Sequence, residues 1–248
     1  MNPFSTTLLA TSLLAVPAAA FAGDATSPFT DSFPTPDGQT VEIALLKHAT
    51  LRIRYAGREI HVDPVGTPLP PAVDYASFPK ADLVLVTHEH FDHFDRDAIE
   101  ALRKPDTVVV ANAPVAAALG FGTALANGGT ASPLPGVTVE ALPAHNTTPE
   151  RLRFHPRGRD NGYLLTLGGF RLYIAGDTEQ TPEMSSLPVV DLAFLPCNLP
   201  YTMTPEQTAA AARAISPKVL IPYHCDPDSA RRVAALLADT PIDVRLRL

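Results

Sequence analysis

The chain has 248 residues, of which 46% are hydrophobic and 18% are charged. This apolar content is enough for one large folded domain and excludes an intrinsically disordered chain. The 26 acidic side chains outnumber the 19 lysines and arginines and give a net charge of −7. Binding of nucleic acid through phosphate neutralisation is therefore not expected.

The first 22 residues read as a targeting segment. They hold no Asp, Glu, Lys or Arg, and an apolar run over residues 8–20 leads into Ala20-Phe21-Ala22. Small residues at the first and third places of that tripeptide match a signal-peptidase site, although the usual basic start is missing. A membrane anchor is the alternative, but the run is shorter than the roughly 20 residues of a span. We predict a signal peptide over residues 1–22, no stable membrane span, and a periplasmic or secreted protein.

The rest of the chain alternates short strands and helices. We expect a lead segment over residues 23–38 and one domain over residues 39–248. In its first half, the apolar patterns predict strands over residues 41–46, 50–55 and 59–63, followed by a Pro-rich connection over residues 64–79. A strand buried on both faces is predicted over residues 81–87, and a helix over residues 96–104 stops at Pro105. Another strand over residues 107–112 and a short helix over residues 114–119, ending at Gly120, complete this half.

The second half repeats this theme. Strands are predicted over residues 137–142, 162–167, 171–176, 189–196 and 218–224, with a tight turn at Gly168-Gly169. Thr204, Pro205 and Gln207 form a capping-box pattern that starts a helix ending near Ser216. A last helix is expected over residues 226–238. Strands mixed with β-α-β units predict layered sheets with helices outside.

Two cysteines follow the last two predicted buried strands. Cys197 comes after residues 189–196, and Cys225 follows residues 218–224. If these strands are neighbours and the compartment is oxidising, the two thiols could pair. Buried free thiols are the equally open alternative, because cysteine is often simply a core residue.

The segment "LVLVTHEHFDHFD" carries the chemistry. His88, His90, Asp92 and His93 crowd into six residues just after a buried strand, and His88 and His90 project to the same side of an extended chain. Imidazoles and carboxylates suit Zn²⁺, Mn²⁺ or Fe. A lone histidine is usually structural, whereas a cluster of polar, mutually repelling groups at a strand end indicates a metal site.

The motif "HEHFDH" resembles the HxHxDH signature of the metallo-β-lactamase superfamily. "HVDPV" with Asp63, "PAHN" with His145, "YIAGDT" with Asp177 and "IPYH" with His224 line up in the same order. "KHATLRI", "YIAGDTE", "YTMTPEQ" and "PKVLIPYH" are similar to the branch of ascorbate-6-phosphate lactonase-like and N-acyl-phosphatidylethanolamine phospholipase D-like hydrolases. The resemblance implies an α/β fold, a four-layer αβ/βα sandwich.

The resemblance also implies a site with two divalent metal ions, Zn²⁺ before Mn²⁺ or Fe. His88, His90 and His145 would hold the first ion, and Asp92, His93 and His224 the second. Asp177 would bridge them, and Asp92, Asp177 and His224 would take part in catalysis. Asp63 would orient a ligand imidazole or cap the turn at Pro64, and His48 would approach the site or lie in an ordinary turn.

The third ligand position is ambiguous, because "PAHNTTPERLRFHP" offers both His145 and His155. We favour His145 because it directly follows a strand, and rigid elements position ligands best. His155 lies in a polar loop and is expected to face substrate or solvent. In the same region, Arg151 and Arg153 would contact an anionic substrate or belong to a solvated loop. Tyr201 would line the pocket wall or pack in the core.

These features predict an exported binuclear hydrolase acting on a small molecule. A metal-bridging hydroxide would attack an ester, lactone, amide or phosphodiester. The alternatives are a redox member of the same fold and a metal-binding protein without turnover. The ligand set favours catalysis, because a structural zinc site needs only four ligands and no open position. The oligomeric state cannot be predicted from these patterns.

Overall fold

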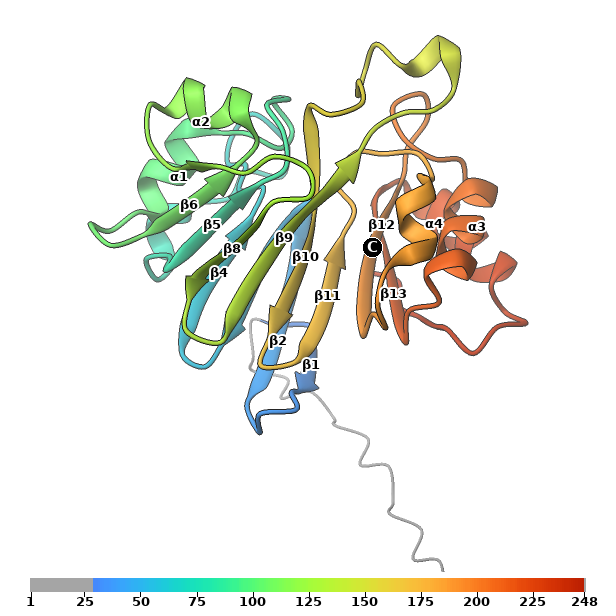
Figure 1. Ribbon diagram of the computed structural model, residues 1–248, viewed down its shortest axis with the longest axis horizontal. Helices are drawn as coiled ribbons and strands as arrows, with labels where there is room; N and C mark the ends of the chain where they lie inside the picture. Colours follow the sequence, from blue (N-terminus) through green and yellow to red (C-terminus); the bar gives the residue numbers. More distant parts are fainter. Residues whose placement is uncertain (1–28, 248) are drawn as a thin grey trace, which may run out of the picture.

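The protein consists of two facing β-sheets with helices on both outer sides (Figure 1). The computed structural model describes residues 29–247, so the predicted signal peptide lies outside the described residues. The first sheet contains, in spatial order, β1 (Asp31–Pro34), β2 (Thr40–Lys47), β3 (Thr50–Tyr55), β4 (Arg58–Val62), β5 (Leu83–Val86), β6 (Val108–Ala111) and β7 (Thr123–Ala124).

The second sheet has the same plan. In spatial order it contains β14 (Asp243–Val244), β13 (Val219–Cys225), β12 (Leu192–Cys197), β11 (Phe170–Ile174), β10 (Asp160–Leu167), β9 (Val137–Ala144) and β8 (Thr130–Leu134). In each sheet the first four strands in chain order pair antiparallel and the later ones pair parallel. The repeat of the theme in the two halves is thus a repeat of topology.

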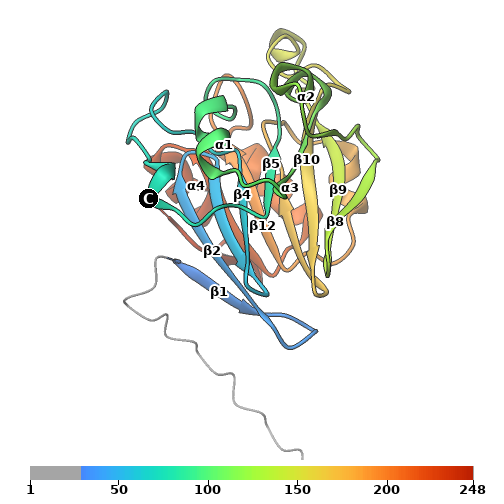
Figure 2. The ribbon, with the colours of Figure 1, turned by 90° about the vertical axis from the view of Figure 1, so that its left-hand side faces the viewer.

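Four α-helices and three 3₁₀ segments complete the described part. They are α1 (Arg96–Leu102), α2 (Ala113–Leu119), α3 (Pro205–Ile215) and α4 (Pro227–Leu236), with η1 (Tyr75–Ser77), η2 (Pro149–Arg151) and η3 (Pro182–Ser186). Helices α1 and α2 cover the outer face of the first sheet, and α3 and α4 cover that of the second (Figures 1 and 2). This arrangement confirms the expected αβ/βα sandwich.

Strand β5 shows how the layers are held together. Leu83 and Leu85 point into the core between the sheets, whereas Val84 and Val86 pack under α1 and α2. Both faces of the strand are buried, as its continuous apolar run predicts. Apolar burial of this kind stabilises a domain by about 25 cal/mol per Å². A strand that is packed on both faces also holds the backbone of the residues directly after it, here Thr87 and His88, in place.

Local signals in the sequence set the element ends. Thr204 caps α3 in a complete capping box with Gln207, as predicted. The segment predicted to be a lead is part of the domain where it is described, because β1 pairs with β2, and Asp31 accepts hydrogen bonds from Arg245 and Arg247 near the other end of the chain.

The two cysteines face each other across neighbouring strands. Cys197 on β12 is in register with Cys225 on β13, and both are free thiols. The two strands are therefore neighbours, which was the condition for pairing, and the two cysteines are not joined in this structure.

Candidate metal centre

Histidines and carboxylates from both sheets meet at one edge of the sandwich. His88 follows β5, Asp177 follows β11, and His224 lies near the end of β13. All three are nearly inaccessible to solvent. The carboxyl ends of parallel strands lie at the same edge of a sheet, and the two sheets present these edges to each other.

The first group of side chains is His88, His90 and His155. One nitrogen from each lies within 4.8 Å of the other two. Nε2 of His88 lies 3.1 Å from Nδ1 of His90. Three imidazole nitrogens converging on one point are a suitable donor set for Zn²⁺ or a similar ion.

The second group is His48, Asp92, His93 and His224, whose donor atoms also lie within 4.8 Å of one another. Nε2 of His48 lies 3.1 Å from Oδ2 of Asp92, and Nε2 of His224 lies 3.5 Å from the same oxygen. The rings of His48 and His224 are 3.6 Å apart between centroids. His48 therefore approaches the site, which was the first of its two interpretations.

Asp177 lies between the two groups. Its Oδ1 is 3.2 Å from Nε2 of His93, and its Oδ2 is 3.4 Å from Nε2 of His155 and 3.3 Å from Nε2 of His224. One carboxylate thus faces histidines of both groups. This is the position that the sequence predicts for a bridging ligand.

Several buried atoms of the site have no hydrogen-bond partner among the described residues. They are Nε2 of His93, His155 and His224, and Oδ1 of Asp177. A buried polar atom without a partner costs about 1–3 kcal/mol, and four of them in one place need a compensating ligand. Divalent cations satisfy imidazole nitrogens and carboxylate oxygens together, so the residues fit a metal centre.

Two further carboxylates orient the histidines. Asp63 accepts a hydrogen bond from Nδ1 of His93 at 2.8 Å and also holds the hydroxyl and amide of Thr87. Asp160 accepts one from Nδ1 of His155 at 2.9 Å. A proton held on Nδ1 leaves Nε2 free to bind a cation. Asp63 therefore orients the imidazole of His93, which was one of its two predicted roles. Asp160 orients the imidazole of His155 in the same way and was not predicted from the sequence.

The geometry does not support the choice of His145 over His155. His145 follows β9, but its side chain joins none of the described ligand groups, and its Nδ1 lies 3.1 Å from the carbonyl oxygen of Asn146. His155 lies with His88 and His90 although it comes from a loop. That loop returns to the sheet edge because the backbone N–H of Asn146 donates a hydrogen bond to the backbone carbonyl of His155 and because Asp160 begins β10.

Electrostatics keep Asp177 and His88 in their cation-binding forms and hold a proton on His224. Burial alone would raise the pKa of Asp177, but His224 and His93 outweigh it and hold that pKa well below its usual value. Burial, assisted by His93, lowers the pKa of His88. At neutral pH, Asp177 is therefore an anion and His88 a neutral imidazole. In the absence of a cation, Asp177 overcomes the effect of burial and raises the pKa of His224 to about 9.

The predicted substrate-binding residues separate into different roles. Arg151 is held by the buried carboxylate of Glu179 at 2.5 Å and by the carbonyl of Thr202 at 2.8 Å, so it fixes its own loop. His155 belongs to the first histidine group rather than to the substrate contacts. Arg153 is exposed beside the Phe154 ring.

A hollow of about 340 Å³ opens onto the site, and Tyr201 lines it as expected. Its other walls come from the histidine motif, from the β9–β10 loop and from the segment after β12. Sequence reasoning missed three of these residues, and the exposed aromatic inside "HEHFDH" was the available signal. The wall residues are His90, Phe91, Asp92, Phe154, Asp177, Asn198 and Tyr201.

Comparisons with known proteins agree with this architecture. A family model described as "Beta-lactamase superfamily domain" matches residues 42–224. A UPF0173 metal-dependent hydrolase of Thermococcus onnurineus is 31% identical over 193 residues, covering 74% of this chain and 84% of the relative. One from Ligilactobacillus salivarius is 34% identical over 183 residues, covering 71% and 81%.

Solved structures show the same fold. A protein of Parabacteroides distasonis that carries the name of a metal-dependent hydrolase is 49% identical with a TM-score of 0.84, over 88% of this chain and 98% of its own. The metallo hydrolase Igni18 of Ignicoccus hospitalis is 26% identical with a TM-score of 0.67, over 84% and 94%. The resemblance to the lactonase-like and phospholipase D-like branch stays a prediction. Among residues 29–247, no helix combines the length and apolar character that a membrane span requires.

The family model and the relatives more than 30% identical show that the chain belongs to the beta-lactamase superfamily, among the UPF0173 metal-dependent hydrolases.

Proposed function

We propose that this protein is an exported hydrolase whose site holds two divalent metal ions, with Zn²⁺ as the first candidate. The observation that carries the proposal is the position of Asp177, whose two oxygens lie 3.2–3.4 Å from histidines of both ligand groups. A carboxylate between two ligand sets is what a shared site for two cations requires. A single structural ion would need neither the second set nor the open hollow.

The assignment of ligands follows the two groups. His88, His90 and His155 would hold one ion; Asp92, His93 and His224 would hold the other, with Asp177 between them and His48, the remaining member of the second group, hydrogen-bonded to Asp92. When bound, two such ions lower the pKa of water and polarise the attacked carbonyl or phosphoryl oxygen.

The protein itself supplies orientation and a place for the substrate. Asp63 and Asp160 fix the Nδ1 proton of His93 and His155, so that the Nε2 atoms stay available. Asp92 lies in the wall of the hollow with 19% of its side chain exposed. Burial alone would raise the pKa of Asp92, but His224 and His48 hold it below its usual value. Asp92 is thus an ionised acceptor that can hold a proton donor, such as a water, in the hollow.

The first test is metal content with a matched activity assay. Full-length chain expressed with its own leader is depleted of metal and reloaded with Zn²⁺, Mn²⁺ or Fe²⁺. We expect two ions per chain and metal-dependent turnover of at least one chromogenic ester, lactone, amide or phosphodiester. His90→Ala is the control and should lose both an ion and turnover. One ion per chain contradicts the binuclear site, and two ions without any turnover favour a non-hydrolytic member of the fold.

Export rests on the composition of residues 1–22 and is tested separately. We expect the mature protein recovered outside the cytoplasm to begin at Gly23. Amino-terminal sequencing of the fractionated protein measures this directly. A chain that retains Met1 and stays in the cytoplasmic fraction contradicts export without affecting the metal centre.

A further inference from the structure

We infer that the hollow beside the metal centre selects substrates with a neutral, apolar group next to the cleaved bond, and disfavours anionic ones. This inference rests on the proposed hydrolase function. It favours the solvated-loop interpretation of Arg151 and Arg153 over the alternative that these arginines contact an anionic substrate.

The wall of the hollow contains an aromatic rim, which we define as Phe91, Phe154 and Tyr201. The three rings come from three separate segments. Phe91 lies between His90 and Asp92 in the histidine motif, Phe154 lies in the β9–β10 loop, and Tyr201 follows β12. The rings of Phe154 and Tyr201 are edge to face with centroids 5.0 Å apart. The rim therefore combines a preformed aromatic pair with a third ring beside the ligands.

The exposure of the rim is unusual for this chain. Phe91 is 66% exposed and Tyr201 is 44% exposed. Of the five large apolar side chains that are exposed in residues 29–247, four lie on the segments that surround the hollow: Phe91, Leu152, Leu199 and Tyr201. Single exposed apolar residues need no explanation, but a gathering of them around one opening marks a binding surface.

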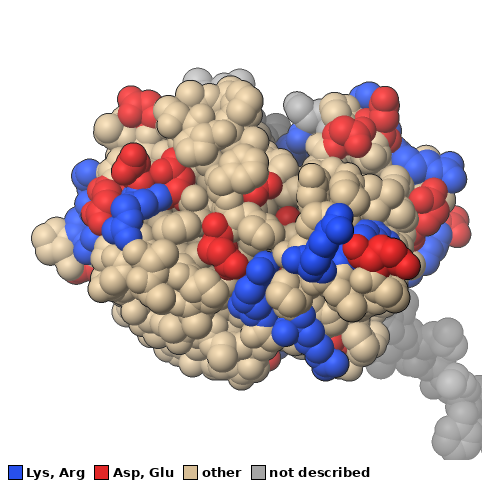
Figure 3. All heavy atoms as spheres, turned by 90° about the horizontal axis from the view of Figure 1, so that it is seen from above, with Lys and Arg blue, Asp and Glu red and all other residues tan. Residues whose placement is uncertain are grey.

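The charged groups near the hollow disfavour an anion. Arg151 is neutralised by Glu179, and Arg159 by Asp160 and Glu89. Figure 3, which looks onto this edge of the sandwich, shows a largely uncharged face with one group of basic side chains, of which only some adjoin acidic ones.

Inside the hollow, the carboxylates of Asp92 and Asp177 are in the wall. Two bound divalent ions would attract an oxygen of the bond that is cleaved. An anionic group elsewhere on the substrate, farther from the ions, would meet the aromatic rim. Within the described residues, Arg153 has no ion pair, and its guanidinium lies 4.8 Å from the centre of the Phe154 ring. The other arginines of this loop, Arg151, Arg157 and Arg159, each pair with a carboxylate, so an anion subsite is best tested at Arg153.

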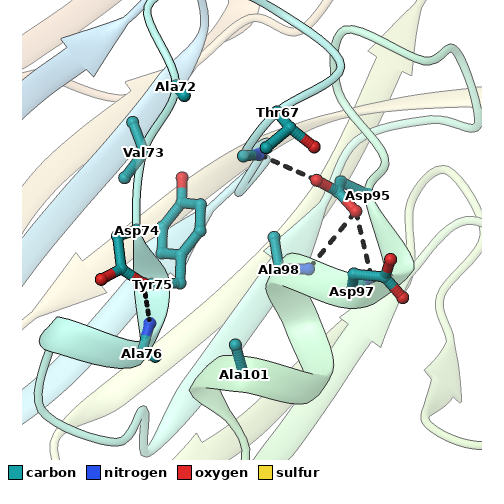
Figure 4. A pocket seen from close by; sticks show the side chains of 11 residues that line it. Thr67, Ala72, Val73, Asp74, Tyr75, Ala76, Asp95, Asp97, Ala98 and Ala101 are labelled. Atoms are coloured by element: carbon teal, nitrogen blue, oxygen red, sulfur yellow. Dashed lines mark hydrogen bonds between the residues drawn. The ribbon is translucent and has the colours of Figure 1, made fainter.

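Another cavity of about 350 Å³ lies between the 64–79 connection and α1 (Figure 4), and it does not compete for this role. Two of its three carboxylates, those of Asp74 and Asp95, are used as caps. Asp95 accepts from the amides of Asp97, Ala98 and Gly66, and Asp74 accepts from the amide of Ala76. Their hydrogen-bonding capacity serves the fold.

The test compares two six-carbon probes by isothermal titration calorimetry on the Zn²⁺-loaded full chain. One is hexanohydroxamic acid, and the other is its analogue in which a carboxylate replaces the terminal methyl group. Both carry the same metal-binding head and differ only in the charge at the far end. A covered methylene contributes about a fourfold gain in affinity. Because the hollow is open on one side, we expect the neutral probe to bind about tenfold tighter overall. Equal or tighter binding of the carboxylated probe, or no binding of either, overturns the inference.

Two rim variants, one matched control and one arginine variant locate the effect. Phe91→Ala and Tyr201→Ala should each weaken the neutral probe several-fold and leave the carboxylated probe within about twofold, with both metal ions retained. Val189→Ala is the matched control, since Val189 is 65% exposed but precedes β12 at the opposite end of that strand. Loss of carboxylated-probe binding in Arg153→Ala, with no effect of the rim variants, would establish an anion subsite instead.

The two proposals fail in different ways. A chain that prefers the neutral probe but hydrolyses no substrate refutes the hydrolase function and leaves the apolar hollow in place. A chain that hydrolyses esters but binds both probes equally refutes the apolar selectivity alone.

Discussion

The replacement of His155 by alanine is the sharpest test of the metal centre, and His145→Ala is its matched control. Both histidines are buried, both lie between β9 and β10, and both have an Nε2 atom without a partner among the described residues. Only His155 lies with His88 and His90. The two variants therefore remove the same side chain from nearly the same place, with opposite expectations.

The size of the effect follows from the contacts. Loss of an outer carboxylate partner of a metal-binding histidine typically costs 10- to 100-fold in metal affinity, or about 1.4–2.7 kcal/mol. Asp160→Asn should fall in this range. His155→Ala removes the nitrogen donor itself, so its loss should exceed 100-fold for the ion at the first histidine group. Asp160 keeps its bonds from Arg159, of which the Nε contact is 2.6 Å, and the fold should lose only about 1–2 kcal/mol.

The assay is metal content by mass spectrometry after equilibration with a weak chelator, with thermal unfolding followed by circular dichroism. We expect two ions per chain in the unmodified protein and in His145→Ala. In His155→Ala we expect one ion, with the fold retained. The assignment is refuted when His145→Ala loses an ion while His155→Ala keeps both.

Three other changes probe separate parts of the structure. Asp177→Asn should reduce hydrolysis at least 100-fold and abolish binding of two ions per chain, because one neutral amide cannot replace the shared anion; retention of two ions at unchanged affinity would disprove the bridge. Uptake of Zn²⁺ by the metal-free protein at pH 7 should release protons, because Asp177 raises the pKa of His224 to about 9 and the cation must displace that proton; calorimetry in buffers of different ionisation enthalpy counts them, and none released would contradict this. Asp31→Asn should lower the free energy of unfolding by about 1–2 kcal/mol at pH 7 in urea titrations. Burial would raise the pKa of Asp31, but Arg247 and Arg245 lower it below the unfolded value near 3.8. The stability that Asp31 contributes is therefore present above pH 3.8 and is lost as the pH falls through the lower folded pKa. The same difference in unfolding free energy between the two proteins at pH 7 and at pH 2 would refute the ion pair.

Much of the fold was predictable because its signals are local. Residues 83–86 form a strand with both faces buried, and the shortness of this apolar run and its alternating valines favour a strand over a helix. The start of α3 was predictable because Thr204, Pro205 and Gln207 satisfy the free amides of a first helical turn by themselves. The edge strand β1 was missed because its short segment has little apolar alternation, and it is held by pairing with β2 and by arginines more than 200 residues away.

The histidine motif was equally predictable, since four donor groups within six residues require no knowledge of distant contacts. His88, His90, Asp92 and His93 all lie in the ligand groups, as do Asp177 and His224. Of the aromatic rim, only Tyr201 was expected to line the pocket. Phe91, Phe154 and Tyr201 are far apart in the chain, and only their meeting around one opening gives them a common role.

His155 shows why a position in a loop does not make a side chain mobile. The β9–β10 loop is anchored by Glu179, a buried carboxylate that accepts hydrogen bonds from the amides of Thr147 and Thr148 and pairs with Arg151. These hydrogen bonds and the ion pair tie the loop to the segment that follows β11. The rigidity that favours a strand-borne ligand is thus available to His155, and the orienting carboxylate Asp160 completes it. The deciding signal was the pairing of a loop histidine with an aspartate five residues later at the start of a strand, a relation that becomes visible only when the loop closes.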